Sequence, residues 1–259
     1  WETYYAREGL EIQKRFFDCF LKGQENGMRE TPRVRIEVRD YFYDGRERYF
    51  DDFPIPETDY RPLYLNAANN SLNAKPVADQ AQYRYAAHKT ESEVDSTTWE
   101  YTFDEAVDLI GHIKLKLWVS AEDADDLDLH VAIKKFDKHG NEVYFPDFQH
   151  IENGLAASGW LRVSHRELDE EKSTPWQPWL KHERLLKLVP CEIVPCEVEI
   201  LASATGFRAG EKLQLIVQGY DIISVFNRFK HEDTVNAGHH IIHTGGDYDS
   251  HLLVPAVAV

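Results

Sequence analysis

The sequence predicts an all-β protein, a jelly-roll β-sandwich preceded by one amphipathic helix. Apolar and polar residues alternate in many short runs, turn residues bound these runs, and one helical pattern precedes them. With 259 residues, of which 42% are hydrophobic, the chain can bury a core without disulfide or metal crosslinks. No alternation of strands with helices is visible, so the sequence does not indicate a parallel α/β sheet.

The helical pattern covers residues 3–23. Phe16, Phe17 and Phe20 belong to an apolar stripe that recurs near helical spacing. Gly23 is a plausible C-terminal stop for this helix, because glycine accepts the left-handed conformation that often ends a helix. An aromatic-rich amphipathic helix at the start of a chain normally packs on something large.

After residue 31 the apolar period changes to two, which is typical of strands with one buried face. The alternating apolar positions are Val34, Ile36, Val38; Ile113, Leu115, Leu117, Val119; Leu127, Leu129, Val131, Ile133; Cys196, Val198, Ile200; and Leu213, Leu215, Val217. Many such strands favour two antiparallel sheets packed face to face. Residues 103–109 and 179–188 are candidates for further short helices.

Charge and cysteine content exclude several protein classes. The formal net charge is −16, which disfavours nucleic acid and anionic membrane surfaces as partners. No apolar run approaches the length of a membrane span. Three cysteines and no signal peptide indicate free thiols in a reducing compartment, so we expect a cytoplasmic protein. The sequence begins at Trp1 and not at a methionine, so we expect further sequence upstream.

The sequence contains no complete catalytic or cofactor motif. Ser158 lacks the leading glycine of the Gly-x-Ser-x-Gly turn that exposes a hydrolase nucleophile. There is no Walker loop and no Gly-x-Gly-x-x-Gly fingerprint, and we expect no cofactor.

Two clusters have the residue types of a metal site. His239 and His243 would share a helix face as zinc ligands do, but neighbouring glycines favour a strand, and a third ligand cannot be placed. The acidic run 122–128 lacks the spacing of a calcium loop and is more typical of a solvated turn. We therefore predict no metal site. Within that run, Asp128 is expected to point away from the core, toward solvent or a neighbouring domain.

Several segments, in their order along the chain, resemble a known family. They are Phe16-Phe17-Asp18, Leu21-Lys22-Gly23, Pro32-Arg33-Val34-Arg35, Phe53-Pro54-Ile55-Pro56, Asp126-Leu127-Asp128-Leu129, Gly159-Trp160-Leu161-Arg162, Phe207-Arg208-Ala209-Gly210-Glu211 and His243-Thr244-Gly245-Gly246. The set resembles the C-terminal part of the X-Pro dipeptidyl-peptidase and cocaine esterase-like (CocE/NonD) serine hydrolases, along nearly the whole chain.

The resemblance implies a division of the chain. Residues 1–31 would be the last helix and linker of an α/β-hydrolase domain that is otherwise missing, and residues 32–259 a galactose-binding-like jelly roll. The Ser-Asp-His triad of the family would lie upstream of Trp1, so no catalytic residue is expected in this chain. The implied partners are that hydrolase domain and a small ester or peptide substrate, with contacts between copies of the protein also allowed.

The resemblance also implies roles for a few residues. Jelly-roll loops of the family help to close the active-site mouth, and the loop 86–98 suggests His88 and Trp99 for this role. Phe16, Phe17, Phe20 and Asp128 are predicted to lie at the interface with the hydrolase domain.

Two other interpretations remain open at the level of sequence. Six tryptophans are compatible with a self-standing carbohydrate- or ligand-binding jelly roll. A metal-dependent hydrolase would rest on His239 and His243. The Phe-rich helix argues against the first, because a free module would hardly keep it.

Overall fold

The strands predicted from the period-two pattern are present. The computed structural model describes residues 5–89, 93–147, 151–222 and 234–259. Its elements are α2 (Arg7–Lys22), β1 (Val34–Tyr41), β2 (Asp44–Phe50), β3 (Asp59–Asn66), β4 (Ser71–Asn73), β5 (Ala81–Ala86), β6 (Ser96–Thr102), β7 (Val107–Ala121), β8 (Asp128–Phe136), β9 (Glu142–Val143), β10 (Phe145–Asp147), β11 (Ile151–Gly154), β12 (Ala157–Arg162), the 3-10 turn η2 (Val163–His165), β13 (Val194–Phe207), β14 (Lys212–Gln218), β15 (His239–Thr244) and β16 (His251–Val257).

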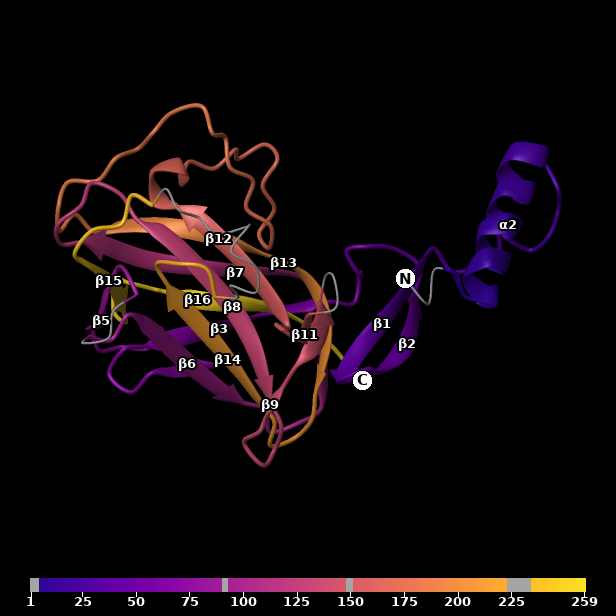
Figure 1. Ribbon diagram of the computed structural model, residues 1–259, viewed down its shortest axis with the longest axis horizontal. Helices are drawn as coiled ribbons and strands as arrows, with labels where there is room; N and C mark the ends of the chain where they lie inside the picture. The colour runs from indigo at the N-terminus through magenta and orange to yellow at the C-terminus, as the bar shows by residue number, and fades with distance from the viewer. Residues whose placement is uncertain (1–4, 90–92, 148–150, 223–233) are drawn as a thin grey trace.

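Most strands belong to one sheet that curls into a sandwich (Figure 1). Its order is β12-β8-β14-β6-β4-β3-β16-β7-β13-β1-β2, with β15 paired to β5 and β7, and β9 paired to β8. The two halves approach closely where β12 packs on β13. A Cβ on Gly159 would lie 2.0 Å from the carbonyl oxygen of Glu199, so only glycine fits at this crossing. The predicted all-β sandwich with one preceding helix is confirmed.

The core lies between the two halves of the sheet. All the inward positions predicted on β7, β8, β13 and β14 are buried, and Trp99 and Phe207 fill the space between them. The strands pair mainly antiparallel, and the central strands β7 and β8 are buried along most of both faces. Among the described residues, no helix is long and apolar enough to cross a membrane.

The predicted N-terminal helix is confirmed, but neither of the two further helices forms. Gly23 ends α2 with φ +67°; its N–H donates to the carbonyl of Cys19, and the N–H of Gln24 donates to the carbonyl of Asp18. Segment 103–109 instead leads into β7. Segment 179–188 donates its backbone N–H groups to another segment: Lys181 N bonds Glu167 O and Leu186 N bonds Ser164 O. These long-range bonds replace the local bonds that a helix needs.

A buried charge network attaches the β1–β2 hairpin to the sandwich. Between β1 and β13 the register contains one parallel pair, Arg39 with Thr205. Asp108 on β7 is fully buried and accepts hydrogen bonds from Arg46 at 2.6 Å and from Arg48 at 2.7 Å, both on β2. The hairpin therefore depends on side-chain ion pairs as well as on the backbone ladder.

Lys135 on β8 closes the same network from the opposite half of the sandwich. Its ammonium group is fully buried and lies 2.8 Å from the Glu211 carboxylate. It also donates to the backbone carbonyls of Asp40 and Gly206, at 2.7 and 2.8 Å. Burial lowers the pKa of Lys135, and the Glu211 carboxylate opposes that shift.

Replacing Lys135 by alanine should destabilise the protein by about 3–5 kcal/mol, because Glu211 would keep its buried charge without a cation. The matched control is Lys134→Ala on the same strand. Lys134 pairs with Glu142 near the surface, and its loss should cost less than about 1 kcal/mol. Urea unfolding of the three proteins at pH 7.5 measures both values. Equal losses in the two variants would contradict the importance of the buried pair.

Candidate functional site

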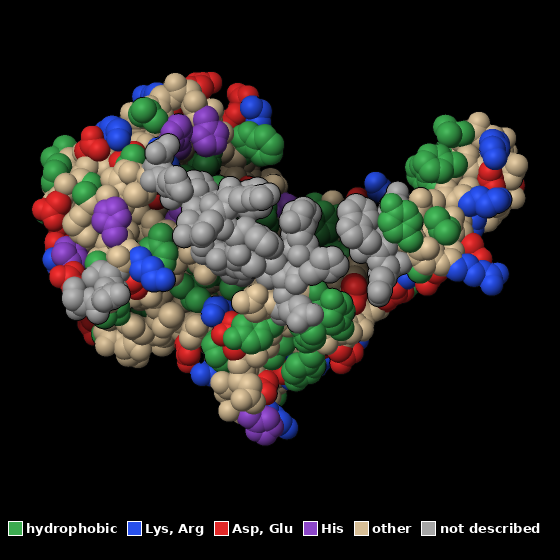
Figure 2. Space-filling model, in the orientation of Figure 1, with side chains coloured by type: hydrophobic (Ala, Val, Ile, Leu, Met, Phe, Trp, Pro, Cys, Tyr) green, Lys and Arg blue, Asp and Glu red, His purple; other side chains and the backbone are tan. Residues whose placement is uncertain are grey.

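The apolar side of α2 is open to solvent. The side chains of Phe16, Phe17 and Phe20 are 46%, 51% and 48% exposed. Their rings pack on one another, with centroids 5.5 Å apart for Phe16–Phe17 and 4.8 Å apart for Phe16–Phe20. Figure 1 shows α2 standing apart from the sandwich beyond β1 and β2, and Figure 2 shows hydrophobic side chains gathered on its surface. Their role at a domain interface stays a prediction.

The two residues predicted at a substrate mouth lie in different environments. His88 follows β5 and is exposed. Trp99 is fully buried on β6, with its ring 6.0 Å from that of Tyr83. The prediction for Trp99 is therefore wrong, because its position on the inward face of a central strand places the indole in the core. Residues 90–92 of the loop between them lie outside the described residues.

Asp128 is engaged within the domain. Its carboxylate accepts two hydrogen bonds from Arg162 on the neighbouring strand β12, at 2.7 and 3.0 Å. The Thr234 hydroxyl and the Val235 N–H also donate to it. Burial alone would raise the pKa of Asp128, but these donors lower it below its usual value. The carboxylate thus holds the start of β8 in place, and it lines a groove.

That groove, of about 700 Å³, lies over the outer face of β12, β8 and β13. It is lined by Asp128, Leu129, His130, Gly159, Trp160, Leu161, Arg162, His165, Pro178, Trp179, Leu180, His182, Glu197, Glu199 and Leu201. Trp160 and Trp179 are 60% and 50% exposed, so two indole rings are available to a ligand. This groove is not among the sites predicted from the sequence. Its signal was the long loop between β12 and β13, whose placement over the sheet only the structure shows.

The described residues include one hydrogen-bonded Ser–His pair, Ser120 Oγ with His243 Nε2 at 2.9 Å. Both side chains are buried, at 1% and 7% exposure. Burial also lowers the pKa of His243. A nucleophile and its base must reach a substrate, so this pair is structural. Ser158 lines a second groove but has no histidine partner in the described part of the chain.

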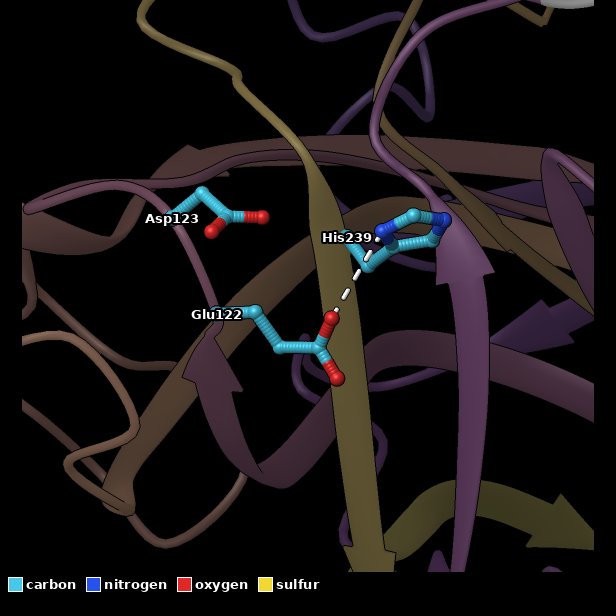
Figure 3. A group of neighbouring side chains, drawn as sticks. All are labelled: Glu122, Asp123 and His239. Carbon is cyan, nitrogen blue, oxygen red and sulfur yellow. Dashed lines mark ion pairs between the residues drawn. The ribbon is translucent and has the colours of Figure 1, made fainter.

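His239 and His243 lie on strand β15 and contact different groups. The strand conformation predicted for this segment is confirmed. His239 Nε2 lies 2.6 Å from Glu93, while its Nδ1 is 3.6 Å from Glu122 (Figure 3). Glu122, Asp123 and His239 lie close enough to share an ion. However, Arg84 already binds the Glu122 carboxylate through two hydrogen bonds, at 2.8 and 2.9 Å. The group is therefore an ion-pair cluster.

The remaining histidine of this strand is part of the core. His240 is 1% exposed, and its Nδ1 lies 3.3 Å from the Tyr85 hydroxyl. Burial lowers its pKa to about 3, because an imidazolium in the core would lose its hydration. The folded protein therefore keeps this side chain neutral at pH values where the unfolded chain protonates it.

This difference should make the protein sensitive to mild acid. Between about pH 6.5 and 3 the unfolded state binds the extra proton, so stability falls as pH falls through that window. From pH 7.5 to 5.5 the loss attributable to His240 is about 1.4 kcal/mol. In His240→Asn that part of the loss should disappear, whereas His239→Asn on the partly exposed neighbour should keep it. Urea unfolding at pH 7.5 and 5.5 measures the free energy of unfolding of each protein. If the loss between the two pH values is unchanged in His240→Asn, it does not come from His240.

Comparison with known proteins extends this picture. A crystallised CocE/NonD family hydrolase from Staphylococcus aureus is 50% identical over 99% of this chain, with a TM-score of 0.94. The match covers 47% of that protein, so this chain spans about half its length. An α-amino acid ester hydrolase shares the fold, with a TM-score of 0.66 and 14% identity over 95% of this chain and 44% of that one.

Sequence comparisons lead to the same group. The cocaine esterase of Rhodococcus sp. (strain MB1 Bresler) is 36% identical over 74 residues, which are 27% of this chain and 12% of the esterase. Residues 26–253 match the family described as the X-Pro dipeptidyl-peptidase C-terminal non-catalytic domain. The match runs from the linker that follows α2 to Leu253 in the last strand, β16. This chain therefore belongs to the family of X-Pro dipeptidyl-peptidase C-terminal non-catalytic domains.

Proposed function

We propose that this chain is the supporting part of a serine hydrolase that cleaves small esters or amides. In this proposal the Ser-Asp-His triad belongs to an α/β-hydrolase domain that precedes Trp1. There the serine attacks the carbonyl carbon, the histidine transfers the proton and the aspartate orients the histidine. The jelly roll positions that domain and contributes loops to the mouth of its active site.

The exposed apolar face of α2 carries the proposal. A free domain would gain by covering these rings, and burying each remaining half ring contributes roughly 1 kcal/mol. The helix lies beyond the β1–β2 hairpin, so the core of the sandwich does not cover it. We therefore assign residues 1–31 to the preceding domain, as its last helix and linker, and residues 32–259 to the jelly roll.

Two further elements of the proposal concern the surroundings of the catalytic domain. His88 is exposed on the loop after β5 and remains our candidate for the substrate mouth. Cys19, Cys191 and Cys196 are free thiols, which supports a cytoplasmic location. Contacts between copies of the complete protein belong to the same proposal.

The same observations weigh against a self-standing carbohydrate-binding module. Such a module needs no amphipathic helix held away from its own core. Its aromatic groove at Trp160 and Trp179 would be its ligand site, but the family and the 50% identical hydrolase both indicate a domain of a larger protein.

A fluorophosphonate probe tests the proposed chemistry. The probe should label the longer polypeptide that includes the region preceding Trp1, and it should leave the 259-residue chain unlabelled, since the nucleophile lies upstream. Intact-mass analysis of both proteins measures the adduct. Labelling of the 259-residue chain, or failure to label the longer protein when its fold is intact, would refute the proposal.

Substituting Phe16, Phe17 and Phe20 together by serine tests the docking helix. Because the rings are half exposed, the melting temperature of the 259-residue chain should shift by less than about 2 °C. Binding to the separately produced preceding domain should weaken by more than about tenfold. Titration calorimetry measures the affinity of the unchanged chain and of the triple variant for the preceding domain. The control is Tyr43→Asn, which removes an exposed aromatic side chain in the hairpin turn and should keep the affinity.

A further inference from the structure

Two histidine rings face each other on the wall of the groove. Nδ1 of His165, at the end of η2, lies 3.0 Å from Nδ1 of His182 in the loop that precedes β13. The ring centroids are 5.0 Å apart and the planes are tilted by 49°. Figure 2 shows histidine side chains next to each other at the upper edge of the sandwich. Both rings line the groove, so an ion reaches them from solvent.

Backbone hydrogen bonds around the pair fix the positions of the two histidines relative to each other. Residues 165–169 run antiparallel to residues 179–186, with a bridge between Leu168 and Leu180 and a 2.9 Å hydrogen bond from Lys181 N to Glu167 O. Glu167 adds an ion pair to Arg184 at 2.7 Å. The two histidines therefore come from opposite sides of a small ladder, and their separation does not depend on one flexible loop alone.

His182 adopts a backbone conformation that costs energy. Its φ is +55°, in the left-handed region that few residues other than glycine occupy, although asparagine, aspartate and histidine are enriched there. Such strain is of order 1 kcal/mol and tends to occur where a side chain must be aimed at a ligand. Here the left-handed residue turns the imidazole toward His165.

We propose that His165 and His182 chelate a divalent transition-metal ion through their Nδ1 atoms. Without metal the two Nδ1 atoms share a hydrogen bond, so one of them carries a proton. On binding, that proton would move to Nε2 of the same ring, which leaves both Nδ1 lone pairs for the metal. Imidazole nitrogens are suited to Cu²⁺, Ni²⁺ and Zn²⁺. The pair is separate from the Glu122, Asp123 and His239 cluster, which lies on β15 and the turn after β7.

If the two nitrogens keep their present separation when an ion binds, that distance selects among these ions. With metal–nitrogen bonds of about 2.05 Å, a separation of 3.0 Å corresponds to an angle of about 94° at the metal. That angle fits adjacent positions of square-planar Cu²⁺ or Ni²⁺. Tetrahedral Zn²⁺ would require the nitrogens to lie roughly 3.3 Å apart. We therefore expect affinities in the order Cu²⁺, Ni²⁺, Zn²⁺.

The surroundings leave the remaining coordination positions open. Among the described residues, no further histidine, cysteine or carboxylate lies close enough to the pair to serve as a third ligand. Water or a small anion in the groove would complete the coordination. Nearby charges nearly balance, since Glu167 and Glu183 offset Lys181 and Arg184.

Titration calorimetry of the untagged 259-residue chain with NiCl₂, and separately with ZnCl₂, tests the site. All proteins carry Cys191→Ser, which removes an exposed thiol that also binds these ions. His165→Asn and His182→Asn should each weaken Ni²⁺ binding by at least roughly tenfold, because one nitrogen cannot chelate. His139→Asn and His239→Asn should leave the affinity unchanged. Circular dichroism and the melting temperature confirm that each variant is folded.

Electron paramagnetic resonance with one equivalent of Cu²⁺ provides a second measurement. The spectrum should show two equatorial nitrogen ligands, and one of them should disappear in either single variant. Unchanged Ni²⁺ affinity in both single variants would overturn the proposal. Loss of binding in His239→Asn would overturn it as well, by moving the site to the acidic cluster. Tighter binding of Zn²⁺ than of Ni²⁺ would refute the assigned geometry.

Discussion

Buried charges hold the β1–β2 hairpin, which leads back to α2, against the rest of the sandwich. Asp108 holds two arginines of β2, and Lys135 reaches across the core edge to Glu211 and to the backbone of β1. Buried ions lose their hydration, and only well-placed partner charges and hydrogen bonds offset that loss. The network is therefore stable in few arrangements. It therefore fixes the direction of the hairpin, and the hairpin in turn leads to the linker of α2.

A rigid attachment with an apolar end suits a domain that positions another one. The solvent-facing side chains of α2 include three half-exposed aromatic rings, at Phe16, Phe17 and Phe20, beside charged residues such as Arg7 and Lys14. A flexible linker would let the two bodies reorient, and an ordered ion-pair network at the hairpin restricts this motion. In the proposed function, the domain supports chemistry that takes place outside its own residues.

The histidines show how the same residue type serves different purposes in one fold. His240 and His243 lie inside the sandwich, where burial keeps them neutral and removes them from any substrate. His165 and His182 lie on the groove wall, where their nitrogens meet and solvent reaches them. The first pair is buried because β15 lies between β5 and β7 and both of its faces are covered. The second pair depends on an irregular loop that folds back over β12 and β13.

The period of apolar residues is a local property, and it was enough to predict the fold class, the C-terminal end of α2 and the inward faces of β7, β8, β13 and β14. The predicted start of the helix, at residue 3, lies before Arg7, where α2 begins. The sequence also placed Phe16, Phe17 and Phe20 on one stripe. Only the tertiary structure decided that Trp99 is buried, that Asp128 binds Arg162 and that His165 meets His182. The contacts concerned join residues that are 16 positions apart for Trp99 and Tyr83, 34 for Asp128 and Arg162, and 17 for His165 and His182. Long-range pairing sets them, and no local pattern encodes it.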